Sequence, residues 1–447
     1  MKPVIVLLSV LFIASFCAAQ DLGHFEEVTA GNLFGLGARQ MAMGGTGIAS
    51  SLDGSALYYN PAALARIHRI EFQVGLTHEK YNNESSQTLE RHPDSLGLTP
   101  ILSRAEIDQT KTHLGSLNLT IPVPTYRGSL VVAFGFHRIM SFDRPALLDI
   151  LDRNDADQIV STYERETESE GINLYTAGAG VELSPNVSAG LALNVYSGKR
   201  RITYDYRYED ETNAYRDGWL KQITEDYIGA AFKGGLLFRP NSKLAIGLTV
   251  ETPVDWQIEK TWFEDSLSGY DDDISVTKLS GKVEYDLKRP FIIGTGIAYR
   301  MRKFTFTGDI EYADWSQMSY GDNPEMALKN DSLQLYYRDV FNIRMGIEYQ
   351  IPKAGLSLRG GLAVLPLAAD KGFYQRNSMT RPLLKNRILN DRVRLSLGMG
   401  WLIDRVILLD VAYVRGGHKL DYTAYNNIGA IRDDYYQRIF ATVSYRY

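Results

Sequence analysis

Three arginines that could hold an anionic ligand, Arg344, Arg392 and Arg394, lie in segments where polar and apolar residues alternate. A guanidinium group donates paired hydrogen bonds to a carboxylate, most strongly where water is excluded. The same polar faces carry acidic residues such as Asp309 and Glu311, and charges on such a face more often meet solvent or pair with one another. The three arginines are therefore candidate ligand-binding residues, with ion pairing inside the protein as the alternative.

Motifs that would support catalysis are missing from the sequence. The seven histidines show no HExxH spacing, and no serine lies in a GxSxG motif. The glycines at 35–37 and 44–45 lack the strand, helix and lysine context of a phosphate-binding loop. The acidic run 271–273 could bind calcium, but three neighbouring aspartates more often form a solvated turn. We expect no enzymatic activity, no cofactor and no metal site.

The first nineteen residues have the pattern of a signal peptide. Lys2 precedes the apolar run 4–16, and Cys17, Ala18 and Ala19 provide small residues for cleavage. A single membrane anchor is disfavoured by the short apolar run, and a lipoprotein by the bulky Phe16 before Cys17. Because the chain has one cysteine, cleavage after Ala19 would leave no thiol for disulfides, redox chemistry or metal binding.

Composition narrows the class of protein further. The chain has 447 residues, of which 23% are charged, and its mean hydropathy of −0.20 is too low for a bundle of membrane helices. The formal net charge is −5, so no basic excess exists to attract nucleic acid. A length of this size fits several soluble domains or one large β-architecture.

Alternation with a period of two dominates the sequence after residue 69. In the segment 304–312, phenylalanine, isoleucine and tyrosine alternate with threonine, aspartate and glutamate, and 341–349 and 393–401 repeat the pattern. Such alternation places apolar and polar side chains on opposite faces of a strand. A soluble sandwich and a membrane barrel both produce this pattern, so alternation alone leaves both open.

The lengths of the connections favour the barrel. Short turns, such as 122–127 and 184–188, alternate with long polar insertions, such as 82–108 and 142–168. Short turns at one end and long loops at the other are typical of outer-membrane barrels. Counting hairpins predicts an all-β, antiparallel transmembrane barrel of about fourteen strands over residues 69–447.

Two segments refine this strand scheme. Pro290 cannot donate a ladder hydrogen bond, and it lies ten positions before the turn at Arg300, which is about one membrane crossing. We predict that it marks the outer interface, with 274–287 continuing the hairpin above the lipid. Leucine and isoleucine spacing within 145–160 predicts an amphipathic helix in a loop, either as a greasy landing surface or packed on other loops.

A segment rich in small residues, 35–65, precedes the first predicted strand. Glycine, alanine and serine let backbones approach closely but bury little apolar area by themselves. Fourteen strands enclose a lumen too wide for wall side chains to fill. We therefore predict that residues 20–68 form a hatch that plugs the lumen, following a signal peptide over 1–19.

This segment resembles the hatch of the FadL/TodX family of outer-membrane hydrophobic-compound transporters. The matching residues are Asp53, Asn60, Pro61, Ala62 and Leu64, and Ala63 stands where the family most often has glycine. Segments 294–315, 342–366 and 391–413 are also similar to the family. A related hatch occurs in PorV barrels, which are docking or shuttle components of type IX protein secretion, so this secretion role is the alternative function.

The resemblance implies a transport mechanism and a set of partners. Long-chain fatty acids or other hydrophobic compounds would diffuse passively to a site between hatch and wall, then leave sideways beside a kink in the third strand. In this chain, Gly135 is where such a kink is least costly, although it could merely make room for the hatch. The final residues, Tyr445 to Tyr447, resemble the signal read by the barrel-assembly machinery. We expect a monomer in outer-membrane lipid.

Overall fold

The computed structural model describes residues 34–88, 104–153, 159–210, 214–270, 273–321, 323–328, 330–368, 373–377, 381–423 and 429–447. The predicted signal peptide and the first part of the predicted hatch lie outside these residues. The described helices are all short, and none of them is long and apolar enough to cross a bilayer.

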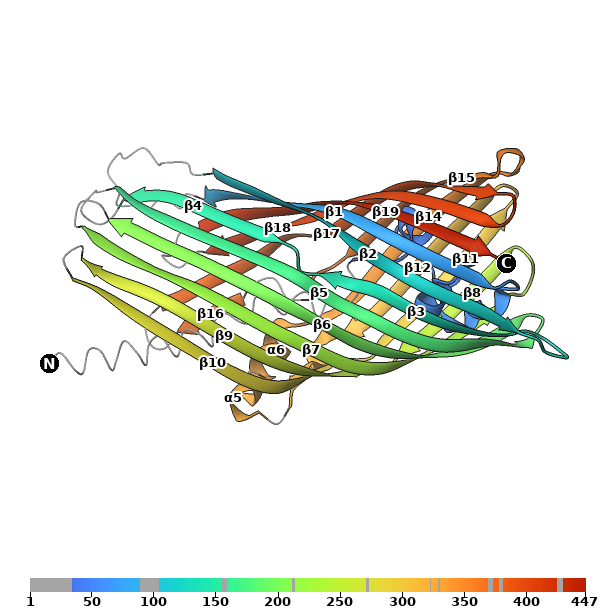
Figure 1. The fold of residues 1–447 in the computed structure, drawn as a ribbon, viewed down its shortest axis with the longest axis horizontal. Helices are drawn as coiled ribbons and strands as arrows, with labels where there is room; N and C mark the ends of the chain where they lie inside the picture. The colour runs from blue at the N-terminus through green and yellow to red at the C-terminus, as the bar shows by residue number, and fades with distance from the viewer. Residues whose placement is uncertain are drawn as a thin grey trace.

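The strands form a closed antiparallel barrel with 14 membrane-crossing positions, as the hairpin count predicted (Figure 1). Two of these positions are divided at a proline into strands in line, β8 with β9 and β10 with β11. β1 pairs with the last strand, β19, along its whole length, which closes the sheet. In chain order, the strands are β1 Glu71–Thr88, β2 Arg104–Val123, β3 Leu130–Ser141, β5 Ile159–Ser184, β6 Val187–Asp210, β7 Tyr215–Phe238, β8 Leu244–Glu251, β9 Val254–Tyr270, β10 Asp273–Arg289, β11 Ile292–Met301, β12 Phe304–Asp314, β14 Asp339–Ile351, β15 Leu356–Leu365, β17 Arg381–Ile403, β18 Ile407–Thr423 and β19 Gly429–Arg446.

Shorter elements lie at the ends of the barrel and inside it. Three short strands, β4 Pro145–Arg153, β13 Ser319–Tyr320 and β16 Phe373–Asn377, pair with longer neighbours. The helices are α3 Ala38–Ala42, α4 Ala56–Tyr59, η2 Pro61–Arg66, η3 Trp315–Gln317, α5 Pro324–Ala327, α6 Asn330–Tyr336 and η4 Pro352–Ala354.

The outer face of the barrel is apolar and the inner face is polar, which is the reverse of a soluble protein. In β17, Leu395 and Leu397 are 60% and 68% exposed, whereas Arg394 and Ser396 between them are 2% and 4% exposed. Other strands repeat this arrangement, and the exposed apolar side chains together form a band around the barrel. The alternation predicted from sequence is confirmed, and it has the orientation that lipid requires.

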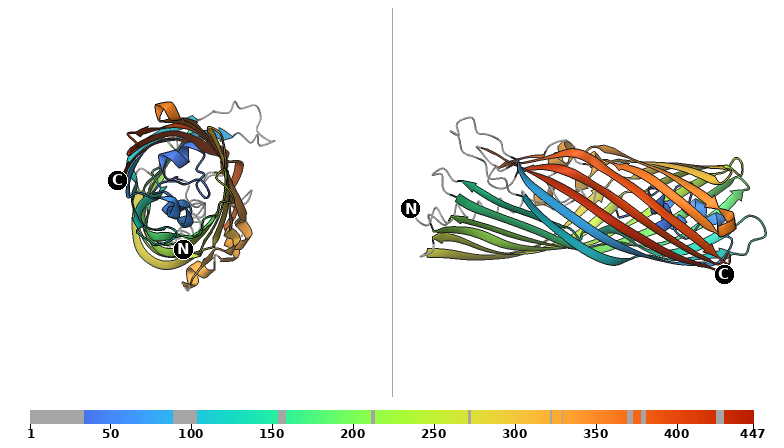
Figure 2. Two further views of the ribbon diagram at one scale, coloured as in Figure 1. Left: turned by 90° about the vertical axis from the view of Figure 1, so that its right-hand side faces the viewer. Right: turned by 90° about the horizontal axis from the view of Figure 1, so that it is seen from above.

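The short turns lie at one end of the barrel, together with the start of β1 and the end of β19 (Figure 2). The backbone nitrogen of Tyr447 donates to the Ile70 carbonyl at 2.9 Å, so the chain finishes beside the start of the first strand. The helices α3, α4 and η2 lie inside the barrel near this end. The opposite end carries the long connections, as the sequence predicted.

Two prolines interrupt the wall at neighbouring positions. β8 ends at Glu251 before Pro253, and β10 ends at Arg289 before Pro290. β11 pairs with β8 and β10 pairs with β9, so the hairpin continues past both breaks into a longer sheet. Among the described residues, the outer edge of β10 pairs only with β13, at Leu287 and Lys288. The predicted extension of 274–287 above the lipid matches this strand.

The predicted helix within 145–160 is wrong. Residues Pro145–Arg153 form β4, whose residues pair one by one with β5 from Thr167 back to Ile159. The leucine spacing fits a helix or a strand over so short a run, and the long β5 edge provides hydrogen-bond partners that a lone helix in a loop would lack. Pairing with β5 therefore makes residues 145–153 a strand and not a helix.

The position of the lipid band can be tested by placing a charge at two exposed apolar sites. L397K, in the middle of a membrane crossing, should destabilise the barrel by about 2–4 kcal/mol because lysine would be desolvated in hydrocarbon. V276K, on β10, should change stability little, since we predict that this 64% exposed residue lies beyond the band. Urea unfolding in lipid vesicles measures both, and equal losses would contradict the assigned band.

Candidate functional site

Residues 34–67, here called the hatch, fill the lumen at the short-turn end of the barrel. They are almost entirely buried although they contain few large apolar side chains, and Ala38, Ala42, Ala56, Ala62 and Ala63 are at or near zero exposure. η2 packs against β5, β6 and β7, while α3 packs against β15, β17, β18 and β19. The hatch therefore contacts opposite sides of the barrel and closes the space between them.

Asn60 and Asp53 organise the hatch from within. Asn60 precedes Pro61 and accepts from the Ala62 nitrogen at 3.1 Å through Oδ1, which caps η2. Its Nδ2 donates to the carbonyls of Ile48, at 2.9 Å, and Leu236, at 3.0 Å, so one amide ties the hatch to itself and to β7. Asp53 accepts from Gln40 Nε2 at 3.2 Å and from the hydroxyl of Ser55. The remaining motif residues, Pro61, Ala62 and Leu64, are buried in η2.

Glycines on the inner face of the wall bring the strand backbone against the hatch backbone. A methyl group at Gly361 would lie 2.0 Å from the Gly44 nitrogen, and one at Gly190 would lie 2.3 Å from the Pro61 carbonyl carbon. Such distances are shorter than van der Waals contact, so no other residue fits without displacing backbone. We call the set of such positions the wall glycines; it comprises Gly180, Gly190, Gly247, Gly346 and Gly361.

A charged network adds polar contacts between hatch and wall. Asp309 of β12 accepts from the backbone nitrogens of Gly47, at 2.6 Å, and Ile48, at 3.0 Å. Arg39 of α3 pairs with Glu348 at 3.2 Å, and Glu348 also pairs with Arg359 at 2.7 Å. These charges are buried and compensated, as a water-poor contact requires.

Tyr59 holds the start of the hatch against its middle. Its hydroxyl donates to the Leu36 carbonyl at 2.9 Å, and burial raises the pKa of this phenol above its ordinary value. The group therefore remains a hydrogen-bond donor across the physiological pH range. The ring also fills the space beside Gly47, where a methyl group would lie 2.3 Å from the Tyr59 ring.

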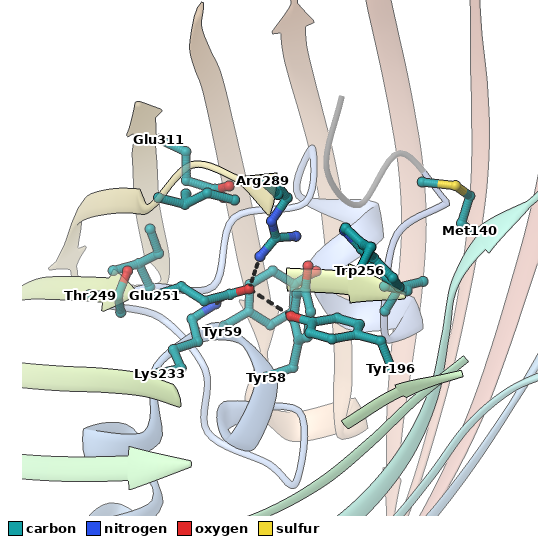
Figure 3. Close-up of a pocket in the computed structure, with 13 residues that line it drawn as sticks. Tyr58, Tyr59, Met140, Tyr196, Lys233, Thr249, Glu251, Trp256, Arg289 and Glu311 are labelled. Atoms are coloured by element: carbon teal, nitrogen blue, oxygen red, sulfur yellow. Dashed lines mark hydrogen bonds and ion pairs between the residues drawn. The ribbon is translucent and has the colours of Figure 1, made fainter. Parts of the chain in front are cut away.

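A pocket lies between the hatch and the wall at the height of the two proline breaks (Figure 3). About 710 Å³ of space not filled by protein atoms lies around these residues, part of it open to the rest of the lumen. Aromatic and aliphatic side chains make much of its surface, together with two cations and two carboxylates. This hatch pocket is lined by Ile48, Tyr58, Tyr59, Ile139, Met140, Tyr196, Lys233, Thr249, Glu251, Trp256, Arg289, Ile292 and Glu311.

Beyond the pocket, apolar side chains continue toward the long-loop end of the barrel. Trp256, Tyr196 and Met140 belong both to the pocket and to a larger buried apolar cluster. This cluster includes Trp315 of η3 and Leu333 of α6, so the connection that carries the short helices covers part of it. The inner face is thus apolar between the hatch and the long-loop end, whereas the lumen faces of open barrels are polar.

The arginines singled out from the sequence face the lumen but do not line the hatch pocket. Arg344 pairs with Glu311, and the Nε of Arg394 donates to the Tyr436 hydroxyl at 3.3 Å. Arg392 is buried on the same inner face, 4% exposed. Arg344 and Arg394 both approach Gly45 of the hatch. A ligand-binding role for the three stays a prediction.

Sequence reasoning missed the two cations that do line the pocket, Lys233 and Arg289. They lie on different strands, and only the register of β7, β8 and β10 brings them to one carboxylate, Glu251. Two signals were available: Arg289 directly precedes Pro290, and Lys233 lies among small and apolar residues on an inner face. Without the strand pairings, neither signal could indicate a common site.

The region around Gly135 has a regular ladder. Gly135 pairs with Asn118 of β2 and Thr176 of β5 without a register shift. The shift in the pairing of β3 with β5 lies instead between Arg138 and Met140. Pairing of β3 with β2 also stops at His137, so the irregular part of this strand adjoins the pocket residues Ile139 and Met140. A wall opening at Gly135 stays a prediction.

Within the described residues, histidine, cysteine, aspartate and glutamate form no group of three that could hold a metal ion. The acidic run 271–273 falls mostly outside the described residues. The polar groups of the site are arranged in ion pairs and hydrogen bonds between hatch and wall.

Adjacent glycines of β15 provide a matched test of hatch docking. G361A should force the hatch away from the wall, at a cost of about 1–3 kcal/mol, and should admit small hydrophilic solutes through the barrel. G360A points to the lipid side, where the new methyl group would lie 3.7 Å from its nearest neighbour, so it should behave as wild type. Antibiotic sensitivity and thermal unfolding measure the two effects. Equal behaviour of both variants would contradict close docking.

Comparison with known proteins places this site in a family. Residues 26–437 match the family described as "Outer membrane protein transport protein (OMPP1/FadL/TodX)". The Pseudomonas aeruginosa FadL homologue is 11% identical with a TM-score of 0.60, and covers 92% of this chain and 98% of its own. The P. putida toluene transporter TodX is 14% identical with a TM-score of 0.59, and covers 92% and 99%. The Ralstonia pickettii toluene transporter TbuX is 13% identical with a TM-score of 0.55, and covers 93% and 99%.

At these identities, the solved structures show a shared fold. No curated protein matches the chain. The family match extends over nearly the whole chain and includes both the hatch and most of the barrel. This chain belongs to the OMPP1/FadL/TodX family of outer-membrane transport proteins for hydrophobic compounds.

Proposed function

We propose that the protein takes up hydrophobic compounds, long-chain fatty acids or smaller molecules, by passive diffusion through the barrel to the hatch pocket. The pocket itself is the observation that supports this function. It is a cavity between hatch and wall whose surface is mainly aromatic and aliphatic, and it continues into the apolar cluster above it. Sites lined mainly by aromatic and aliphatic side chains, with a few polar groups among them, are typical binding sites for small hydrophobic molecules.

Movement of the hatch would control passage beyond the pocket. Ile48, Tyr58 and Tyr59 line the pocket and belong to the hatch, so a ligand in the pocket touches the plug directly. The hatch is held by hydrogen bonds such as those of Asp309 and by close backbone contact, without a covalent link among the described residues. A ligand can therefore shift the hatch only by the difference in its affinity for the two hatch positions.

Sideways exit into the membrane is supported by the third strand. Ile139 and Met140 line the pocket, and the ladder of β3 with β5 shifts register between Arg138 and Met140. A strand with few ladder bonds opens at lower cost than a fully paired one. We place the exit at this stretch of β3, above Gly135.

A docking role in protein secretion is the second candidate, and one feature favours it. The sheet formed by β5, β6, β7, β9 and β10 extends past the proline breaks (Figure 1). Its outer face carries Leu220, Phe263 and Leu267, which are 38–40% exposed, and the more exposed Val276. Exposed apolar side chains beyond the lipid band could contact another protein. This role would leave the hatch pocket empty.

Filling the pocket should abolish uptake. T249W places an indole where Thr249 lines the pocket and is 4% exposed, whereas T295W puts the same group on the lipid face of neighbouring β11. Cells that depend on each variant would be given radiolabelled toluene and oleate. We expect T249W to lower uptake of at least one compound about tenfold and T295W to leave both unchanged. Folding of each barrel is checked by its heat-dependent migration in detergent gels.

Two results together would contradict transport and support the secretion role. The first is equal uptake by wild-type cells, by cells with T249W and by cells that lack the protein. The second is the loss of secreted proteins from cells that lack the protein. Native mass spectrometry of protein extracted in mild detergent provides a second reading. Bound fatty acid or hydrocarbon supports transport, whereas an empty barrel with stably bound secretion partners contradicts it.

A further inference from the structure

The hatch pocket is lined by equal numbers of cations and carboxylates. Lys233 and Arg289 are the two cations, and Glu251 and Glu311 are the two carboxylates. Glu311 is paired with Arg344, which lies outside the pocket lining. The pocket therefore presents two positive charges and one negative charge on the Glu251 side, and a compensated acid on the other side. A low-dielectric cavity makes the state of each charge decisive for binding.

Glu251 already serves as the anion for both pocket cations (Figure 3). Its Oε1 accepts from Arg289 and from the Tyr196 hydroxyl, the latter at 2.6 Å, and its Oε2 lies 3.5 Å from Lys233 Nζ. Four groups from β6, β7, β8 and β10 meet in this cluster. A carboxylate ligand would have to compete with a buried carboxylate that is held by three donors.

The faces of two aromatic rings are also occupied by these cations. Lys233 Nζ lies 4.9 Å from the ring centroid of Tyr58, and the guanidinium carbon of Arg289 lies 5.6 Å from that of Tyr196. Such cation–π contacts further satisfy the charges inside the protein. The cations are thus committed to Glu251 and to the rings, and they are poor partners for an anionic ligand.

Two hydrogen-bond donors in the pocket lining have no acceptor among the described residues. They are the indole Nε1 of Trp256, whose side chain is 2% exposed, and Nε of Arg289, whose residue is 6% exposed. A buried donor without an acceptor costs free energy that a ligand acceptor can recover. The pocket therefore offers unpaired donors, whereas each of its charged side chains already has a partner within the described part of the chain.

We propose that the hatch pocket selects neutral, mainly apolar molecules that carry a hydrogen-bond acceptor, such as an aromatic ketone, aldehyde or ester, and that it discriminates against carboxylates. Trp256 donates to the acceptor, and Glu251 excludes anions because it already occupies the position between Lys233 and Arg289 where an anion would bind. The inference rests on the proposed function, since it assigns the ligand class of the same pocket, and it narrows that function to neutral compounds rather than fatty-acid anions. Glu251 and Trp256 are then specificity-determining residues.

Three compounds of similar size separate these possibilities: ethylbenzene, acetophenone and phenylacetate. Equilibrium dialysis of the full barrel in detergent at neutral pH, against empty micelles, measures the affinity of each. We expect acetophenone to bind about fivefold more tightly than ethylbenzene, and phenylacetate to bind at least about tenfold more weakly than acetophenone. Equal or tighter binding of phenylacetate would overturn the inference.

Two variants test the assigned roles. W256F keeps an aromatic ring but lacks the N–H group, so the ratio of acetophenone affinity to ethylbenzene affinity should fall to about one, whatever change in affinity the two compounds share. E251Q leaves Lys233 and Arg289 without their shared anion, so phenylacetate binding should rise at least about tenfold. Unchanged phenylacetate binding in a folded E251Q barrel would overturn the role of Glu251. If E251Q does not fold, the wild-type ranking and W256F still decide the inference.

The outcomes also separate this inference from the proposed function. If none of the three compounds binds the wild-type barrel, the pocket is not a ligand site and the proposed function fails with it. If ethylbenzene binds but acetophenone is no better and phenylacetate no worse, the transport function stands and the neutral-acceptor selectivity is wrong. A selective gain of phenylacetate in E251Q supports both.

Discussion

The close approach of hatch backbone to wall backbone is the interaction on which the rest of the structure depends. Fourteen strands enclose a lumen too wide to be filled by their own side chains, so a plug is needed to close it. At Gly361 and Gly190, a single methyl group would collide with the hatch main chain. The small residues of the hatch and the wall glycines form the two surfaces of this contact. Both surfaces need small residues because the two backbones approach each other closely.

The polar contacts depend on this packing. Once backbone meets backbone, buried carbonyls and amide nitrogens need partners. Asp309 accepts hydrogen bonds from two backbone nitrogens of the hatch. The side-chain amide of Asn60 donates both to a carbonyl of the hatch and to a carbonyl of β7. The pocket lies beside Ile48 and Tyr58 of the hatch, next to the two proline breaks in the wall, and aromatic side chains line much of it. Its charges compensate one another, so it suits apolar molecules.

Local sequence features predicted the fold well because they depend on few residues. The period of two, the alternation of turn lengths and the position of Pro290 all follow from covalent geometry and the ladder. The hatch was predictable from small residues and Asn60 with Pro61. The residues that meet in the pocket were not, because Lys233, Glu251 and Arg289 come together only through strand register. Likewise, the leucines of β4 fit a helix until β5 is known to offer an edge.

Ion conductance across a planar bilayer tests most directly whether the hatch closes the barrel. The intact mature protein should show no steady conductance, because residues 34–67 fill the lumen from wall to wall. A variant lacking residues 34–66 should form a stable open pore of large conductance, since the remaining strands still close the barrel through β1 and β19. A steady open pore in the intact protein, equal to that of the deletion variant, would contradict the structural role assigned to the hatch.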